Sequence, residues 1–384
     1  MSITSTVPET PVVVEDFIVD DEVERNQQII SIVTKFVPLP AFSNAPADAA
    51  FSVTVLSGGI TNQLYRVQVQ SKDSVVVRVF GKETQRIISR ESELFYQSLF
   101  LRTFCQGKNF LIYEFLDGFR DIDFVDMPTH RLAIAKQFAA FHLTATKHSR
   151  EVGRFEKEAL TAIDTLRQWS VDAFTEEAVS KLSDKQLATL TGAGMTSNAI
   201  HSHVNDLLSK LETVRNELVV GVCHNDLLCA NIMRRTTSGS DIGGDLVFID
   251  FEYGNRNFLL YDLANHFNEY VGLECNYDKF FPADDLILEF VVEYRRAMRE
   301  LLLDGITPFG ESTQSAFFST SDEAEQLVCL QWIKYVKLLT LASNALWSCW
   351  AIMQAAHSVI DFDFADYATH RWRRFIATKD SFSQ

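Results

Sequence analysis

The stretch Val-Gly-Val-Cys-His-Asn-Asp-Leu-Leu-Cys-Ala-Asn (residues 220–231) decides how this chain is interpreted, together with Phe-Ile-Asp-Phe-Glu-Tyr (residues 248–253). An aspartate on a loop that follows a short apolar strand, as Asp226 does, can accept the proton of a substrate hydroxyl. Asn231 and Asp250 offer a carbonyl and a carboxylate, which are the oxygen ligands that Mg²⁺ takes beside nucleotide phosphates. The spacing is therefore typical of phosphoryl transfer to a hydroxyl.

The residues around these side chains predict how they are held. The apolar run 218–223 reads as a strand, and residues 231–235 and 245–249 read as two more strands joined by a polar, glycine-rich loop. Such a hairpin would bring Asn231 and Asp250 together. A purely structural reading stays open, because Asp and Asn at strand ends also serve to fix turns.

Composition limits the classes of function. The chain has 384 residues, is 47% hydrophobic and carries a net charge of −16, which argues against nucleic acid or an anionic membrane as its main partner. An acidic surface fits a cationic substrate, but it also serves solubility alone. Six cysteines without a Cys-x-x-Cys pair, and no recognisable signal peptide at the N-terminus, lead us to expect a cytoplasmic protein with reduced thiols.

Residues 338–356 contain no charge and approach the length of a membrane span. The polar side chains of Thr340, Asn344 and Gln354 would be costly in lipid. We therefore expect a buried helix and no stable membrane insertion.

The order of patterns predicts an α+β fold with a small β lobe and a large helical lobe. We expect a flexible extension over residues 1–20, an N-terminal lobe over 21–116 and a mostly helical C-terminal lobe over 117–384. The elements expected in the N-terminal lobe are a helix over 21–36, a linker over 38–50, strands over 51–57, 65–70, 75–80 and 110–115, and a helix from 85 to about 103.

A glycine-rich loop lies between the first two of these strands, where backbone amides can approach a phosphate. Its candidate ATP-binding residues are Ser57, Gly58, Gly59, Thr61 and Asn62. Two glycines between strands also form ordinary hairpin turns, so this loop alone is weak evidence.

The strand Val-Val-Val-Arg-Val-Phe (residues 75–80) strengthens the nucleotide interpretation. Arg78 shares a face with apolar side chains and needs an anionic partner if that face is covered. We predict Glu91 on the following helix as this partner, which would leave Arg78 free to contact ATP phosphates; a solvated arginine on an edge strand is the alternative. Glu114 and Leu116 lie where the chain crosses between lobes, and their backbone groups are candidates for binding adenine.

Together these motifs resemble the choline/ethanolamine kinases, which have the two-lobed aminoglycoside-phosphotransferase variant of the protein-kinase fold. The resemblance covers about residues 52–376 and includes Tyr-Asp-Leu-Ala-Asn-His-Phe-Asn-Glu-Tyr (residues 261–270). The sequence Asp-Leu-Leu-Cys before Asn231 resembles the ethanolamine branch. The chain departs from the family between residues 95 and 109, where it is shorter and lacks the usual Pro-x-Leu-Tyr turn.

The resemblance implies transfer of the ATP γ-phosphate to ethanolamine, for phosphatidylethanolamine synthesis. It implies Asp226 as the catalytic base, Asn231 and Asp250 as Mg²⁺ ligands, and Glu114 with Leu116 as the adenine hinge. ATP would be the co-substrate and Mg²⁺ the cofactor. Family members often form homodimers, so a homodimer is also an open expectation.

The amine pocket can be argued from charge, since an ammonium that leaves water needs a carboxylate or aromatic faces. We expect Asp262 to be the structural N-cap of a helix over 263–270 and to share a face with Glu269. The resemblance makes Glu269 the ammonium-side residue; a solvated helical glutamate is the alternative. It also implies an aromatic wall, although aromatic pairs at helical spacing more often belong to the core. The residues of this wall would be Tyr253, Trp347, Trp350 and Tyr367.

Three functional readings stay open: an ethanolamine kinase, a kinase of the same fold acting on choline or both amines or on an aminoglycoside, and a nonenzymatic scaffold. The scaffold is disfavoured because Asp226, Asn231 and Asp250 are all present. Aromatic residues speak against an aminoglycoside cleft, which would be lined by many carboxylates.

Overall fold

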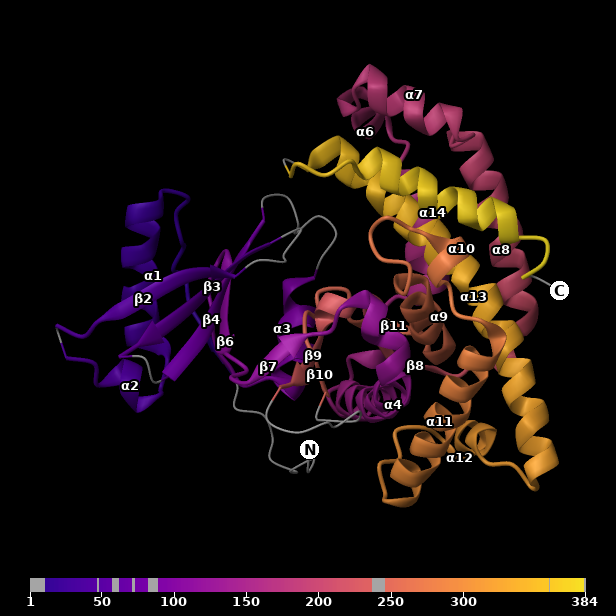
Figure 1. Cartoon of the computed structure of the whole chain (residues 1–384), viewed down its shortest axis with the longest axis horizontal. Coiled ribbons are helices and arrows are strands. Elements are labelled where there is room, and N and C mark those ends of the chain that lie inside the picture. The colour runs from indigo at the N-terminus through magenta and orange to yellow at the C-terminus, as the bar shows by residue number, and fades with distance from the viewer. Residues whose placement is uncertain are drawn as a thin grey trace. The chain divides into compact units, whose positions relative to one another are not determined.

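The computed structural model describes residues 11–46, 48–56, 62–70, 73–81, 89–236, 246–358 and 360–382 (Figure 1). The chain divides into two compact units. The first contains residues 1–120, 235–238 and 248–252, and the second contains residues 121–234, 239–247 and 253–384. The segment 248–252, which carries Asp250, therefore groups with the first unit although it lies far along the chain.

The first unit is built on a six-stranded sheet with the strand order β1-β5-β6-β4-β3-β2. Neighbouring strands from β2 through β3, β4 and β6 to β5 pair antiparallel. Strand β1 pairs parallel with β5 at the edge of the sheet. The strands are β1 (Val12–Val13), β2 (Phe51–Leu56), β3 (Asn62–Val69), β4 (Asp73–Phe80), β5 (Thr103–Gln106) and β6 (Phe110–Glu114), and the helices are α1 (Glu22–Phe36), α2 (Pro40–Ser43) and α3 (Arg90–Phe100).

One face of this sheet carries the apolar core of the unit. Helices α1 and α2 lie on that face (Figure 1) and bury Ile29, Val33 and Phe42 against alternate residues of the strands, such as Val75 and Val77 of β4. Because successive side chains of a strand point to opposite faces, the neighbouring Arg78 points to the other face. The alternation therefore separates the hydrophobic core of the unit from a charged face.

The expectation of a loosely held extension up to residue 20 is wrong for its second half. Strand β1 pairs with β5, and Ile18 is fully buried. The backbone of Ile18 exchanges two hydrogen bonds with the side chain of Asn109, at 2.9 and 2.7 Å. Residues 11–20 are held because they extend the sheet, a long-range pairing that local composition does not reveal.

Two further expectations are corrected in this unit. The helix expected from 85 to about 103 is seen as α3 over Arg90–Phe100; residues 85–88 lie outside the described residues, and the chain enters the short strand β5 at Thr103. The expected linker contains the short helix α2, whose Phe42 is buried. Both misses involve elements of four residues, which are too short for a hydrophobic period to appear.

The second unit is mostly helical, as expected. Its helices are α4 (Met127–Glu151), α5 (Leu166–Asp172), α6 (Glu176–Lys181), α7 (Asp184–Gly192), α8 (Ser197–Val214), α9 (Leu259–Glu269), α10 (Tyr277–Phe280), α11 (Asp284–Leu303), α12 (Glu311–Gln314), α13 (Asp322–His357) and α14 (Phe364–Thr378). The predicted strand after residue 218 is β8 (Val220–Cys223). It pairs antiparallel with β11 (Asn255–Phe258), a strand that was not predicted.

The expected hairpin is present as β9 (Ile232–Arg235) and β10 (Leu246–Phe248), which are neighbours in a three-stranded sheet of order β10-β9-β7. Strand β7 (Phe119–Asp121) was also missed, because the sequence after residue 118 was expected to be helical. The loop expected to join the hairpin strands lies largely outside the described residues.

Helix α13 contains the uncharged stretch 338–356. It passes the length and hydropathy test for a membrane span, and 94% of its apolar window is buried inside the protein. The helix packs along α14 (Figure 1) and also against α9. The prediction of a buried helix is confirmed, because neighbouring helices and not lipid cover its apolar surface.

Candidate active site

The loop after β8 presents the predicted catalytic base. Cys223 ends the strand, Asn225 adopts a left-handed backbone conformation with φ 66°, and Asp226 follows with a partly exposed side chain. Asparagine tolerates this conformation better than most residues. The side-chain nitrogen Nδ2 of Asn231 donates to the carbonyl of Asp226 at 2.9 Å, so the amide oxygen of Asn231 remains available as an acceptor.

The buried carboxylate of Asp262 fixes the backbone of this loop by hydrogen bonds. Its carboxylate accepts the backbone N–H groups of His224 at 2.6 Å and Asn225 at 2.8 Å, and it bonds to Nε2 of His142 at 3.0 Å. The expected structural role is therefore seen, but Asp262 is not an N-cap: α9 begins at Leu259, and Asp262 lies in its first turn. A buried carboxylate with three partners fixes the loop that carries Asp226.

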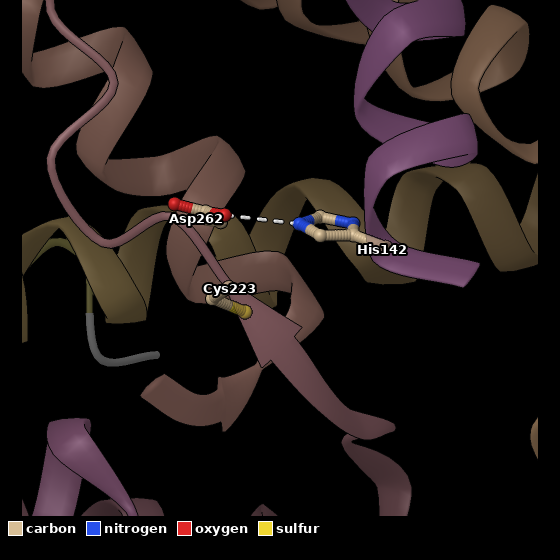
Figure 2. Close-up of side chains that lie close together, drawn as sticks. All are labelled: His142, Cys223 and Asp262. Atoms are coloured by element: carbon tan, nitrogen blue, oxygen red, sulfur yellow. Dashed lines mark hydrogen bonds and ion pairs between the residues drawn. The ribbon is translucent and has the colours of Figure 1, made fainter. Parts of the chain in front are cut away.

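His142, Cys223 and Asp262 form a close group of side chains that resembles a metal site in composition (Figure 2). The other ring nitrogen of His142 bonds to the hydroxyl of Tyr294 at 2.7 Å. Burial raises the pKa of Cys223 well above its usual value, which disfavours the thiolate that a metal would need. The chemistry of this group therefore fits a structural network that supports the loop.

Arg78 is the centre of the charged face in the first unit. Its Nη1 lies 2.8 Å from Glu93 and 2.8 Å from Asp250, and its Nη2 bonds to Glu252. The guanidinium is 2% exposed, so these carboxylates supply the countercharge that burial demands. Burial opposes the charged form, but the three carboxylates hold the pKa of Arg78 well above its usual value.

The prediction that Glu91 pairs with Arg78 is wrong, because the helical partner is Glu93. Glu91 is exposed, whereas Glu93 is almost fully buried against Arg78. Two residues correspond to about 200° of rotation around an α-helix, so the two glutamates lie on opposite faces. The sequence contained both candidates, and only the helix phase distinguished them.

Glu252 was not predicted as a site residue. It accepts Nδ2 of Asn62 at 3.1 Å in addition to its bond with Arg78, and its side chain is 4% exposed. Burial, reinforced by the charge of Asp250, raises the pKa of Glu252 to about 7, and Arg78 opposes this rise. Asp250 itself has a φ of 65°, so the segment that offers it is turned sharply.

Of the residues predicted to bind ATP in the glycine-rich loop, the structure describes only Asn62. Ser57, Gly58, Gly59 and Thr61 lie outside the described residues, whereas Asn62 begins β3.

The predicted hinge lies at the end of β6. The N–H of Glu114 donates to the carbonyl of Arg102 at 2.9 Å, and its carboxylate accepts the N–H of Arg102 at 2.8 Å. The carbonyl of Leu116 accepts the N–H of Phe119 at 3.2 Å. Adenine binding by Glu114 and Leu116 stays a prediction.

The predicted aromatic residues Tyr253, Trp347 and Trp350 do cluster. The ring of Tyr253 lies 5.1 Å from that of Trp347, which lies 5.3 Å from that of Trp350, and both contacts are edge-to-face. Nε1 of Trp350 donates to the hydroxyl of Tyr253 at 2.8 Å. Trp169 of α5, 6.5 Å from Tyr253, joins this group and was missed because it is distant in sequence.

Tyr367 reaches these three aromatics only indirectly, through Phe362 and Phe364, which contacts Trp350. It packs beside Val271, Cys275 and Tyr277, and its ring is 5.9 Å from that of Phe362. No ring contact between Tyr367 and the other predicted wall residues is found in the described part of the chain. Tyr253, Trp347 and Trp350 therefore lie together, and the role of these three and of Tyr367 as a wall for the amine stays a prediction.

Glu269 has a protein partner that was not anticipated. Its Oε1 accepts Nη2 of Arg371 at 2.6 Å, and the side chain is 9% exposed. The alternative of a solvated helical glutamate is therefore wrong.

A family model described as choline/ethanolamine kinase matches residues 53–376. The chain belongs to the choline/ethanolamine kinase family. Two relatives of this kinase-family chain are a probable ethanolamine kinase A of Dictyostelium discoideum, 29% identical over 93% of both chains, and ethanolamine kinase 1 of Mus musculus, 30% identical over 85% of this chain and 84% of the relative.

Solved structures confirm the two-lobed fold expected for this kinase family. An ethanolamine kinase from Plasmodium vivax superposes with a TM-score of 0.68 at 21% identity, covering 94% of this chain and 90% of that one. A choline kinase from Cryptosporidium parvum gives a TM-score of 0.67 at 20% identity, covering 92% of this chain and 95% of that one. At these identities the likeness concerns the fold.

Proposed function

We propose that this chain is an ethanolamine kinase that transfers the γ-phosphoryl group of ATP to the hydroxyl of ethanolamine. The observation that carries the proposal is the loop fixed by Asp262, which presents Asp226 and orients the amide of Asn231. The names of the relatives support ethanolamine as the substrate, since the two described above are named as a probable ethanolamine kinase and an ethanolamine kinase.

The chemistry assigned to Asp226 is general-base catalysis. Its carboxylate accepts the proton of the substrate hydroxyl while the oxygen bonds to the γ-phosphorus of ATP. The bond between that phosphorus and the β–γ bridging oxygen breaks, and ADP leaves. The products are phosphoethanolamine and ADP, with the hydroxyl proton on Asp226.

Mg²⁺ is the cofactor that the family implies, and the oxygen donors present fit it. Asp250 supplies a partly exposed carboxylate, and Asn231 keeps its amide oxygen because its nitrogen is occupied. These are hard ligands suited to Mg²⁺, which when bound would offset the charge of the phosphates. We propose Asn231 and Asp250 as its protein ligands.

Arg78 is proposed to contact the phosphates of ATP. Its buried ion pairs with Glu93 and Glu252 hold the guanidinium in one place. A cation that is already oriented loses little entropy on binding an anion. Asn62, whose side-chain amide donates to Glu252, would support it from β3.

The amine is proposed to bind near Glu269 and the cluster of Tyr253, Trp347 and Trp350. Aromatic faces attract any cation, whereas a carboxylate can also accept the N–H groups of a primary ammonium. The aromatic cluster keeps choline, or use of both amines, as the second candidate. We further propose a cytoplasmic location, as expected from the cysteine pattern, and a homodimer, as implied by the family resemblance.

The test is a steady-state assay of the purified chain with ATP and Mg²⁺. Ethanolamine, its mono- and dimethylated derivatives and choline are compared by kcat/KM, with loss of ATP tied to formation of the phosphorylated amine. We expect the value to fall with each added methyl group. A higher kcat/KM for choline would overturn the ethanolamine assignment, and no phosphorylation of any of these amines would overturn the kinase proposal.

A further inference from the structure

The pair formed by Glu269 and Arg371 joins two helices in the second unit. Glu269 is the last residue of α9, and Arg371 lies in the middle of α14. Their 2.6 Å hydrogen bond is charge-assisted, and the two side chains are only 9% and 1% exposed. A buried carboxylate with a guanidinium partner is both oriented and electrically compensated.

Arg371 is itself held from several sides. Its Nη1 donates to the hydroxyl of Tyr277 at 3.2 Å, and that hydroxyl donates to Oδ1 of Asn344 at 2.7 Å. The guanidinium also lies over the ring of Tyr367, 5.6 Å from its centroid. These contacts come from α10, α13 and α14, so the guanidinium position is fixed by tertiary packing.

The pair lies close to the proposed substrate and catalytic groups of the same unit. Asn265 lies one turn before Glu269 on α9 and accepts Nε1 of Trp347 at 2.8 Å. Nδ1 of His266, three residues before Glu269 on the same helix, is hydrogen-bonded to the carbonyl of Leu227 at 2.9 Å, and Leu227 follows Asp226 in the catalytic loop. Helix α9 therefore carries Glu269 close to both the aromatic cluster and the loop that presents Asp226.

The positive charge of Arg371 offsets the negative charge of Glu269 and occupies one of its two carboxylate oxygens. Oε1 is occupied, which leaves Oε2 as the acceptor, and the net charge of the pair is close to zero. A primary ammonium gains from such an acceptor because it has N–H donors, whereas a quaternary ammonium has none and gains mainly from net negative charge or aromatic faces. The pair therefore favours hydrogen-bonding amines over permanent cations.

We propose that Arg371 is a positioning residue that determines amine specificity, by orienting Glu269 and cancelling its charge so that a primary ammonium is preferred. The inference rests on the proposed amino-alcohol kinase function. Loss of Arg371 would leave a negative, less ordered Glu269 that attracts ethanolamine and choline alike.

The experiment measures kcat and KM for ATP, ethanolamine and choline in Arg371→Met, Arg371→Lys and the control Arg373→Met. Arg373 is exposed and lies two residues further along α14. For Arg371→Met we expect the ethanolamine-to-choline ratio of kcat/KM to fall about tenfold, the size of one lost charge-assisted hydrogen bond, with KM for ATP changed less than about twofold. Arg371→Lys keeps a cation and should lower the ratio by only about threefold.

The outcomes separate this inference from the proposed function. A wild-type chain that phosphorylates amines, with a ratio unchanged in both Arg371 variants, would overturn the role of Arg371 alone. Equal losses for ATP and both amines would assign Arg371 to the fold only. If Arg371→Met does not fold, the ratio in Arg371→Lys decides the question. A wild-type chain inactive on both amines would overturn the proposed function and this inference with it.

Discussion

Nη1 of Arg78 lies 2.8 Å from Oδ1 of Asp250, and 172 residues of sequence separate the two. This contact ties strand β4 to the segment that carries the proposed metal ligand. One side chain thus joins the proposed phosphate-binding and metal-binding residues of the first unit.

Glu93 and Glu91 give a matched pair of variants on one helix. Glu93→Gln should raise KM for ATP by roughly ten- to a hundredfold, since it removes a charge-assisted hydrogen bond of about 1.5 to 3 kcal/mol that orients Arg78. Glu91→Gln on the exposed face should leave KM for ATP within about twofold. Initial rates over a range of ATP concentrations give both values, and equal effects would contradict the assignment of Glu93 as the partner.

Asp250→Ala should make activity depend on far more Mg²⁺. The substitution removes the charged oxygen ligand proposed for the ion that offsets phosphate charge. Activity is titrated against Mg²⁺ at fixed ATP in the variant and in wild type. Overlapping titration curves would show that Asp250 is not a ligand.

Asp226→Asn should lower kcat by at least about 10²-fold, the loss expected for a positioned general base. Nucleotide affinity should stay near that of wild type, because Asp226 is assigned to the proton of the substrate hydroxyl and not to the phosphates of ATP. Calorimetric ATP binding serves as the control for folding. Retention of near wild-type turnover would remove Asp226 from the mechanism.

We expect the free energy of unfolding to depend on pH through the ionisation of Glu252. Its pKa is raised from a usual value of 4.5 to about 7 in the folded chain, so the native state binds this proton more tightly than the unfolded state does. The contribution of Glu252 to stability is therefore fully present below pH 4.5 and is lost as the pH rises through about 7.

Glu252→Gln, which mimics the protonated form, should remove this part of the pH dependence. The free energy of unfolding is measured by urea denaturation at pH 5 and pH 8 in both proteins. We expect wild type to lose more stability than the variant between these values. Parallel losses would show that Glu252 does not titrate in this range.

Trp350→Phe tests whether the aromatic cluster contacts the cation. The variant keeps a ring but loses the hydrogen bond from Nε1 to Tyr253, and phenylalanine attracts cations less than tryptophan does. We expect kcat/KM for choline to fall several-fold more than that for ethanolamine. Trp332→Phe, at a buried tryptophan of the same helix that packs on Tyr294 and Phe317, is the control. The same loss for both amines would assign Trp350 to the core.

Much of the site was predictable because its chemistry lies in short, ordered motifs. The spacing of Asp226 and Asn231 within one loop predicted a base and a ligand, and alternation along β4 predicted that Arg78 needs an anion if its face is covered. The burial of α13 was also predictable, from polar side chains that lipid would not tolerate. In these cases the local pattern carries the physical requirement.

Partner choice was decided by tertiary structure. Helix phase selected Glu93 over Glu91, and packing of α14 against α13 fixed the guanidinium that meets Glu269 from 102 residues away. The sequence by itself determined which residue types carry the chemistry and where strands and long helices form. Which charges meet was decided only when distant segments packed together, because a buried charge takes as its partner whichever opposite charge the fold places within reach.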